Sequence, residues 1–243
     1  MVVTCPTCGV SNPSGSTTCA GCGASLTAPS GARPRVLLRV VRADGGAETV
    51  LPMRGEVMTV GTAGDLTLPD DPFVAPVQVR FFFSGGRLAV EDAGGGNGVF
   101  ARLRGERELP VGGELRLGRQ RLLLELVPAA TAAPDGALAW GSPDPGYRLR
   151  IVQLLEGGMR GGAFPLREGD NLLGRETGDI VFPTDGFVSG RHAVLKARGE
   201  RLVVRDVGSS NGTFLRLTNA VFVDSGDQFL IGRELVRVEL QPT

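Results

Sequence analysis

The amino-acid sequence predicts an all-β protein in which two similar sandwiches follow a small cysteine-rich unit. Three observations lead to this fold class. Glycine and proline are abundant, with 37 and 16 residues, and they separate short apolar runs whose lengths suit β-strands. No stretch shows the apolar periodicity and the caps of an amphipathic helix. The strand-rich part of the chain also repeats itself, which indicates two copies of one domain.

The composition divides the chain into five segments. Residues 1–23 hold all four cysteines, and residues 24–34 form a small-residue and proline-rich linker. A first strand-rich domain is expected at 35–128 and a second at 147–243. Between them, "AATAAPDGALAWGSPDPG" at 129–146 is typical of a second linker.

The duplication is visible at several places along the two strand-rich segments. "VEDAGGGNGVFARL" at 90–103 matches "VRDVGSSNGTFLRL" at 204–217 with an offset of 114 residues. "ELRLGR", which ends at 119, and "QFLIGR", which ends at 233, have the same offset. Matches spread this widely indicate duplication of a domain of about 95 residues.

Charge and hydropathy exclude several function classes. The 26 basic residues balance 26 acidic ones, so no global field favours nucleic acid or an anionic membrane. No apolar run approaches the length of a membrane span, and no secretion signal begins the chain, so we expect a soluble cytoplasmic protein. We expect no enzyme, because the single histidine, His192, has no nucleophile or acid partner in a paired motif.

Three polar motifs of the second repeat lie between its apolar runs: "LGRETGD", "FVSGRHA" and "DVGSSNGTF". Loops at one end of a sandwich converge although they are far apart in sequence. The residues expected to converge are Arg175, Ser189, Arg191, Ser210 and Asn211. Guanidinium, hydroxyl and amide donors presented together suit a tetrahedral anion such as phosphate.

These motifs, in this order and spacing, resemble the forkhead-associated (FHA) domain, a β-sandwich that recognises phosphothreonine in partner proteins. The resemblance covers about residues 147–241 and implies two tandem FHA-like sandwiches. It implies that Arg175 and Ser189 contact the phosphate, that Ser210 lies nearby and that Asn211 binds the ligand main chain. Arg191 lies in the same loop as Ser189 and is expected to add positive charge.

The same resemblance assigns structural roles to further residues. His192 is expected to be a framework residue that holds Ser189 in position, and the glycines are expected to permit tight turns: Gly174, Gly208 and Gly212. Gly190 departs from the family, which often has a second polar side chain there, and this puts one contact with the ligand main chain in doubt.

The first repeat has lost the residues that would hold phosphate. Its residues at the positions of Arg175, Ser189, Arg191, His192 and Ser210 are Thr62, Ala75, Val77, Gln78 and Gly96. Only the turn-forming pair remains, Asn97 and Gly98. We therefore expect a degenerate FHA-like sandwich, which acts as a spacer or as a protein-binding surface.

Two CxxC pairs, Cys5 with Cys8 and Cys19 with Cys22, favour one structural Zn²⁺ held by four thiolates. The unit resembles the short zinc ribbons of bacterial regulatory proteins. Disulfides and a redox pair are the alternatives, although neither a secretion signal nor a βαβ context is present. Residues 1–32 contain no charged side chain, so this unit suits protein contact or end-capping better than nucleic acid.

Together these features predict a phosphothreonine-dependent adaptor that acts downstream of a Ser/Thr kinase. One alternative is a phosphate-independent assembly scaffold, and another is a nucleic-acid-binding regulator that uses the zinc ribbon. Trp140, in the second linker, is expected either to dock onto a sandwich or to anchor a partner.

Overall fold

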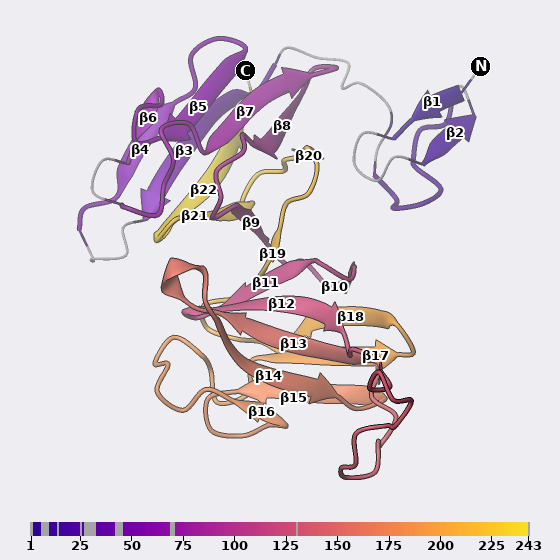
Figure 1. Cartoon of the computed structure of the whole chain (residues 1–243). Coiled ribbons are helices and arrows are strands. Elements are labelled where there is room, and N and C mark those ends of the chain that lie inside the picture. Colours follow the sequence, from indigo (N-terminus) through magenta and orange to yellow (C-terminus); the bar gives the residue numbers. More distant parts are fainter. Residues whose placement is uncertain are drawn as a thin grey trace. The chain divides into compact units, whose positions relative to one another are not determined.

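The computed structural model describes residues 2–5, 10–13, 15–24, 26, 33–41, 46–68, 71–129 and 131–242 (Figure 1). These residues form strands and loops, together with one short 3-10 turn at Glu156–Gly158. The predicted all-β fold class is therefore confirmed. Among the described residues, no helix has the length and apolar character needed to cross a membrane.

The cysteine-rich unit contains one antiparallel pair of strands, β1 (Val2–Thr4) and β2 (Ser11–Pro13). Turns and loops make up the rest of its described part, which contains Cys5, Cys19 and Cys22. Cys8 lies outside the described residues.

The two sequence repeats contain the same succession of strands. In the first repeat these are β3 (Arg35–Val41), β4 (Thr49–Pro52), β5 (Val57–Gly61), β6 (Leu66–Thr67), β7 (Val79–Ser84), β8 (Arg87–Asp92), β9 (Val99–Arg102), β10 (Glu106–Leu109), β11 (Glu114–Leu117) and β12 (Gln120–Leu126). In the second repeat they are β13 (Leu149–Leu154), β14 (Arg160–Leu166), β15 (Gly169–Gly174), β16 (Ile180–Val181), β17 (Ala193–Arg198), β18 (Arg201–Asp206), β19 (Thr213–Arg216), β20 (Val221–Phe222), β21 (Gln228–Ile231) and β22 (Glu234–Gln241).

The two sandwiches exchange the last three strands of each repeat. Unit 1 comprises Met1–Ala101 and Arg216–Thr243, whereas unit 2 comprises Arg102–Leu215. In unit 1, the strand order β9-β21-β22-β3-β4 forms one layer and β20-β8-β7-β5-β6 the other. In unit 2, the corresponding orders are β19-β11-β12-β13-β14 and β10-β18-β17-β15-β16. Each unit is therefore a complete sandwich built from both repeats.

The exchanged strands are fully paired and supply much of each core. Strand β22 pairs with β3 from Leu235↔Val41 to Gln241↔Arg35, and β12 pairs with β13 from Leu126↔Leu149 to Leu122↔Gln153. In unit 1, the side chains from the second repeat that join the core are Val223, Phe229, Ile231, Val236 and Val238. In unit 2, those from the first repeat are Leu109, Leu115, Leu117, Leu122 and Leu124. Burial of each such side chain stabilises the fold by about 1.5–3 kcal/mol, so neither core is complete without the exchange.

The compact units thus differ from the domain boundaries expected at 35–128 and 147–243, which follow the sequence repeats. The physical reason is that the corresponding strands of the two repeats have the same alternation of buried and exposed positions. Strand β11 and strand β21 both bury their second and fourth residues. Each core therefore accepts the strands of the other repeat.

The second linker also has a different role from the one expected. Residues 129–146 join β12 to β13, which are antiparallel neighbours in one sheet of unit 2 (Figure 1). The segment is therefore a loop within one unit, and the chain passes between units near 101–102 and 215–216 instead. Trp140 in this loop is 98% exposed, so the expected docking onto a sandwich is wrong.

Candidate functional site

The polar motifs of the second repeat meet in the loops at one end of unit 2, called here the loop end. Arg175 follows β15, Ser189 precedes β17, and Ser210 and Asn211 lie between β18 and β19. The Arg175 N–H donates to the Ser189 carbonyl at 2.9 Å, and the Ser210 N–H donates to Ser189 Oγ at 3.1 Å. Asn211 Nδ2 donates to the Phe187 carbonyl at 2.8 Å. Hydrogen bonds therefore hold the three motifs together.

His192 is the buried centre of this arrangement. It has no exposed surface, and its Nδ1 accepts the Ser189 N–H at 3.0 Å. Because Nδ1 is an acceptor, the ring proton lies on Nε2, which is 3.1 Å from the Gly212 carbonyl and donates to it. Burial lowers the pKa of His192, so the neutral tautomer is favoured. The ring thus links the loop of Ser189 to the loop of Asn211.

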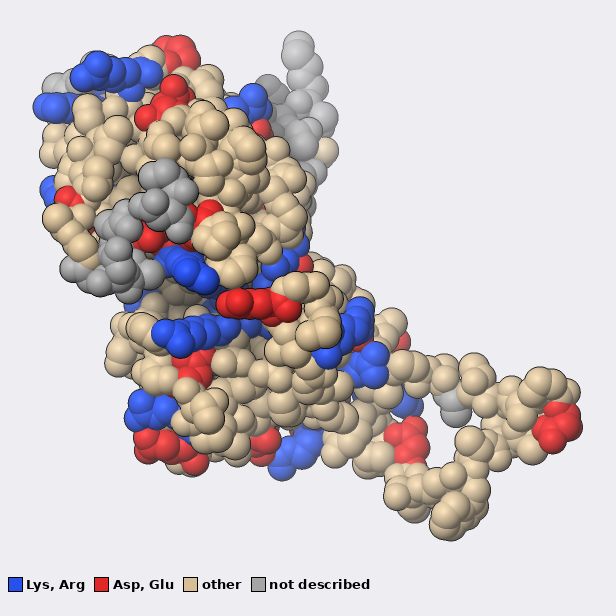
Figure 2. All heavy atoms as spheres, turned by 60° about the vertical axis from the view of Figure 1, so that its left-hand side comes forward, with Lys and Arg blue, Asp and Glu red and all other residues tan. Residues whose placement is uncertain are grey.

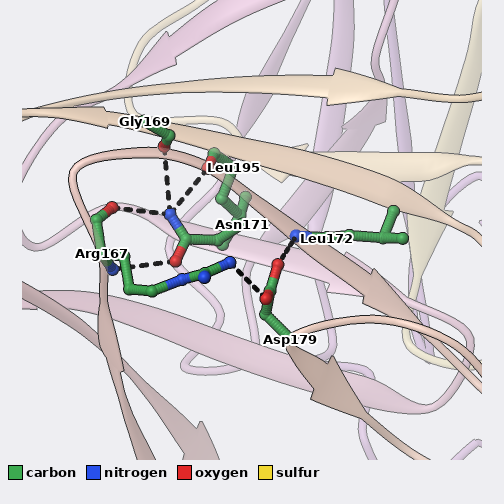
Figure 3. Close-up of polar contacts among 6 residues, drawn as sticks. All are labelled: Arg167, Gly169, Asn171, Leu172, Asp179 and Leu195. Carbon is green, nitrogen blue, oxygen red and sulfur yellow. Dashed lines mark hydrogen bonds and ion pairs between the residues drawn. The ribbon is translucent and has the colours of Figure 1, made fainter.

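The loop of Arg175 is fixed at its base by two side chains (Figure 3). The Asp179 carboxylate accepts the Leu172 N–H at 2.8 Å and pairs with the Arg167 guanidinium. Asn171 is 1% exposed, and its Nδ2 donates to the carbonyls of Arg167, Gly169 and Leu195. These contacts close the 175–178 loop and hold β15 in place, so the position of the Arg175 backbone is well determined.

The Arg175 guanidinium bonds to Glu176, with Oε1 accepting from Nη2 at 2.6 Å and from Nε at 3.1 Å. The Arg175 side chain is 37% exposed, so its guanidinium remains open to a ligand from solvent. Arg191 is also exposed and lies two residues after Ser189. The loop end therefore contains two arginines with side chains accessible to solvent, Arg191 in the same loop as Ser189 and Arg175 in a loop hydrogen-bonded to it.

Two glycines are required at the loop end, Gly174 by the close approach of neighbouring backbone and Gly212 by its backbone conformation and the nearby Arg102 side chain. A Cβ at Gly174 would lie 2.1 Å from the Gly190 carbonyl oxygen and 2.4 Å from that of Thr177. Gly212 has φ of +87°, in the left-handed region, and a Cβ there would lie 2.5 Å from Arg102 Nε. Neither position tolerates a side chain without a shift of the loops.

Asp206 is a structural residue of the loop end that the sequence analysis missed. Its carboxylate accepts the N–H groups of Gly208 and Ser209 and the hydroxyls of Ser209 and Thr213. Burial alone would raise the pKa of Asp206, but these hydrogen bonds outweigh that effect and lower the pKa. The carboxylate thus shapes the loop that presents Ser210 and Asn211. Asp92 occupies the equivalent position of the first repeat, so the aspartate shared by both repeats could have indicated this structural role.

The corresponding end of unit 1 keeps this framework of hydrogen bonds and lacks the arginine and serine side chains of the loop end of unit 2. Gln78 is 1% exposed, and its Oε1 accepts the Ala75 N–H at 3.2 Å, as His192 accepts the Ser189 N–H. Asn97 Nδ2 donates to the Phe73 carbonyl at 3.0 Å, as Asn211 donates to Phe187. The loops therefore have a similar framework in both units, but unit 1 has no arginine or serine at the positions of Arg175, Arg191 and Ser189.

The cysteine-rich unit brings three sulfur atoms together. The Sγ atoms of Cys5, Cys19 and Cys22 all lie within 4.8 Å of one another, and those of Cys5 and Cys22 are 3.7 Å apart. That separation is far longer than the about 2.05 Å of a disulfide bond. It is close to the edge, about 3.8 Å, of a tetrahedron whose Zn–S distances are about 2.3 Å. The cluster has the dimensions of a metal site.

Backbone and side-chain donors surround one of these sulfurs. Cys19 Sγ accepts the Gly21 N–H at 3.3 Å and the Asn12 Nδ2–H at 3.6 Å. Asn12 is itself 1% exposed, and its Oδ1 accepts the Ala20 N–H at 2.8 Å. Donors of this kind stabilise a thiolate and orient it, as expected of groups that surround a metal ligand.

Surface charge is mixed. On the face shown in Figure 2, Lys and Arg side chains are interspersed with Asp and Glu side chains, and neither sign forms a continuous stripe.

Comparison with known proteins identifies relatives of part of the chain. The FHA domain model matches residues 171–232. The FHA domain-containing protein FhaB of Mycobacterium tuberculosis is 36% identical over 99 residues, which are 40% of this chain and 63% of FhaB. The glycogen accumulation regulator GarA of Mycolicibacterium smegmatis is 33% identical over 47% of this chain and 73% of GarA. The FHA domain of CT664 protein from Chlamydia trachomatis aligns with a TM-score of 0.34 and 11% identity over 84% of this chain and 96% of that one.

Proposed function

The chain belongs to the FHA-domain family, and we propose that unit 2 binds a phosphothreonine segment of a partner protein at its loop end. In this proposal Arg175 and Ser189 contact the phosphate, Ser210 lies beside it, and Arg191 adds positive charge. Asn211 binds the ligand main chain. The convergence of Arg175, Ser189 and Asn211, held together by hydrogen bonds around buried His192, is the observation that carries the proposal.

The hydrogen bonds within the loop end leave donor groups available to bind a phosphate. Ser189 Oγ already accepts the Ser210 N–H, so its own proton is available to donate. A hydroxyl donor and a guanidinium form charge-assisted bonds to phosphate oxygens, which are stronger than neutral ones. Phosphothreonine carries about −1.5 to −2 charge at neutral pH, and unmodified threonine offers nothing comparable. Binding should therefore depend on phosphorylation.

The proposed cellular role is that of an adaptor downstream of a Ser/Thr kinase. The relatives with printed functions are regulators or inhibitors by name, and the loop end of unit 2 contains no nucleophile paired with a base. The degenerate loop end of unit 1 favours phosphate-independent contact there, because its loops keep their shape and lack cationic side chains. Unit 1 would then add a second, constitutive contact to the phosphorylation-dependent one.

We further propose that Cys5, Cys8, Cys19 and Cys22 hold one structural Zn²⁺. The three described sulfurs lie within 4.8 Å of one another, one pair at 3.7 Å, and Cys8 completes the set in sequence. When bound, zinc would supply most of the folding energy of this small unit, which has too few apolar residues for a core. Metal analysis of the purified chain should find one zinc per chain, and Cys5→Ser should release it. A chain that retains its zinc in this variant would contradict the assignment.

The test of the main proposal is a titration of the full chain with peptides that carry phosphothreonine, phosphoserine or threonine. Binding should require phosphothreonine. Arg175→Ala should weaken it by about 1.5–3 kcal/mol, the usual contribution of a hydrogen bond to a charged group. Arg201→Ala is the matched control, because Arg201 is an exposed arginine at the far end of β18. Equal affinity for threonine and phosphothreonine would overturn the proposal.

A further inference from the structure

The strand exchange brings a residue of the first repeat to the loop end of unit 2. The turn between β11 and β12 contains Gly118 and Arg119, and it packs against the loop that leads to Ser189. Asp185 is 4% exposed, and its Oδ2 accepts the Arg119 N–H at 2.8 Å and Gln120 Nε2–H at 2.7 Å. Its Oδ1 accepts the Phe187 N–H at 3.0 Å. A buried carboxylate thus joins the turn to this loop.

The Arg119 side chain contacts Phe187, which is a neighbour of the proposed ligand-binding residues. Its guanidinium stacks over the Phe187 ring, 4.9 Å from the ring centre, and Phe187 is 47% exposed. The carbonyl of the same phenylalanine accepts the hydrogen bond from Asn211 Nδ2. One residue therefore separates Arg119 from the side chain proposed to bind the ligand main chain.

Three properties prepare Arg119 to bind an anion. Its backbone N–H is bound by Asp185, its guanidinium carbon lies over an aromatic ring, and the side chain is exposed. Because contact with the ring already restricts the rotamers of the arginine, the side chain loses less conformational entropy when it binds a carboxylate in a bidentate manner. Within the described part of the chain, no acidic side chain forms an ion pair with this guanidinium.

We propose that Arg119 is a specificity-determining residue that recognises an acidic side chain of the phosphothreonine ligand, close to the phosphate. This inference rests on the proposed function of unit 2 and deepens it. It means that the first sequence repeat, which has lost its own phosphate-binding groups, contributes a contact to the site of the second. The favoured ligand is then a phosphothreonine segment with an aspartate or glutamate near the phosphothreonine.

Unit 1 supplies a matched control for this proposal. There the Arg233 N–H donates to Asp71, and the Arg233 guanidinium stacks over the Phe73 ring, 4.6 Å from its centre. The anchoring is the same, but the neighbouring loops lack the phosphate-directed residues. A purely structural role would make Arg119 and Arg233 equivalent, whereas a role in ligand selection would be confined to Arg119.

The experiment measures affinity of the full chain for phosphothreonine peptides in which glutamate replaces glutamine at each position near the phosphothreonine. At one position, glutamate should tighten binding about 2- to 5-fold, the range for an exposed ion pair. Arg119→Gln should remove this preference and leave the requirement for phosphate intact. Arg233→Gln should preserve the preference. Arg119→Glu should reverse it, so that lysine in the peptide is favoured at the same position.

The outcomes separate the two proposals. Phosphate-dependent binding with an acidic preference that Arg119→Gln leaves unchanged would overturn the role of Arg119 alone. The absence of an acidic preference at every position would do the same. If no phosphothreonine peptide binds the wild-type chain, both proposals are overturned. Arg119→Gln keeps the backbone N–H that donates to Asp185, so the turn should keep its structure. If this variant has wild-type thermal stability and loses the preference for an acidic peptide residue, the result would support selection by the Arg119 side chain.

Discussion

The loop ends of unit 1 and unit 2 have the same framework and different chemistry. Gln78 and His192 are both buried, and each accepts the backbone N–H of the residue three positions earlier, Ala75 or Ser189. Only unit 2 has an arginine at the position of Arg175 and a serine at the position of Ser189, where unit 1 has Thr62 and Ala75. The comparison indicates that buried acceptors maintain the shape of the loops, whereas the phosphate binding proposed for unit 2 would depend on a few exposed donors that unit 1 lacks.

The largest expected effect concerns the core on which each loop end rests. Leu117 and Ile231 occupy equivalent positions of the two repeats and have no exposed surface, but the exchange places Leu117 in unit 2 and Ile231 in unit 1. Leu117→Ala should destabilise unit 2 by about 2–5 kcal/mol, and Ile231→Ala should destabilise unit 1 by a similar amount. Amide hydrogen exchange in β15 and β17, compared with β5 and β7, measures each effect.

Destabilisation of the other unit by either substitution would contradict the exchange of strands between the repeats. If Leu117→Ala lowers protection of β5 and β7 while β15 and β17 keep theirs, then each repeat folds with its own last strands. Phosphopeptide affinity provides a second readout, because only the variant that loosens unit 2 should weaken binding.

The next effect tests the buried acceptors. His192→Ala leaves the Ser189 N–H and the Gly212 carbonyl without their partner, at a cost of about 1–3 kcal/mol for each buried group. The free energy of unfolding in urea should fall by about 2–6 kcal/mol. His192→Gln should recover part of this loss, because Gln78 makes the equivalent bond in unit 1. No recovery by glutamine would show that the two frameworks are not interchangeable.

A smaller effect is a pH dependence confined to unit 2. Burial lowers the pKa of His192, so the folded state binds its proton less readily than the unfolded state does. The contribution of neutral His192 to the free energy of unfolding should be fully present above the unfolded pKa of about 6.5, and it should be lost as the pH falls below that value. The stability difference between the wild-type chain and His192→Gln should therefore shrink from pH 8 to pH 5. The cost of Gln78→Ala should stay constant over the same range, and an equal pH dependence of both would contradict this account.

The smallest effect concerns Glu176, which binds the Arg175 guanidinium in unit 2. Glu176→Gln should tighten phosphopeptide binding by about 2- to 5-fold, because it removes a carboxylate that competes with the phosphate and repels it. Glu200→Gln is the control, since Glu200 is exposed in the turn between β17 and β18. Fluorescence anisotropy measures both affinities, and weaker binding by Glu176→Gln would show that Glu176 assists the ligand.

The sequence predicted the fold class, the duplication and the convergence of Arg175, Ser189 and Asn211, because each depends on local patterns and on the geometry of a sandwich. It could not predict the exchange, since β11 and β12 bury their apolar residues at the same positions as β21 and β22, and the pattern does not say which core each pair completes. For the same reason it missed the contact of Arg119 with Asp185, which joins two repeats. Proline and glycine marked 129–146 as a loop, but composition does not tell a loop within a sheet from a linker between domains.

The most direct test of the central claim is a two-dimensional NMR titration of the full chain with a phosphothreonine peptide. The account predicts shift changes at residues 174–176, 189–192 and 209–212, and none at the equivalent loops of unit 1, residues 62, 75–78 and 96–98. The unphosphorylated peptide should cause none. Changes centred on unit 1, or the same changes with unphosphorylated threonine, would contradict the claim that only unit 2 recognises phosphate.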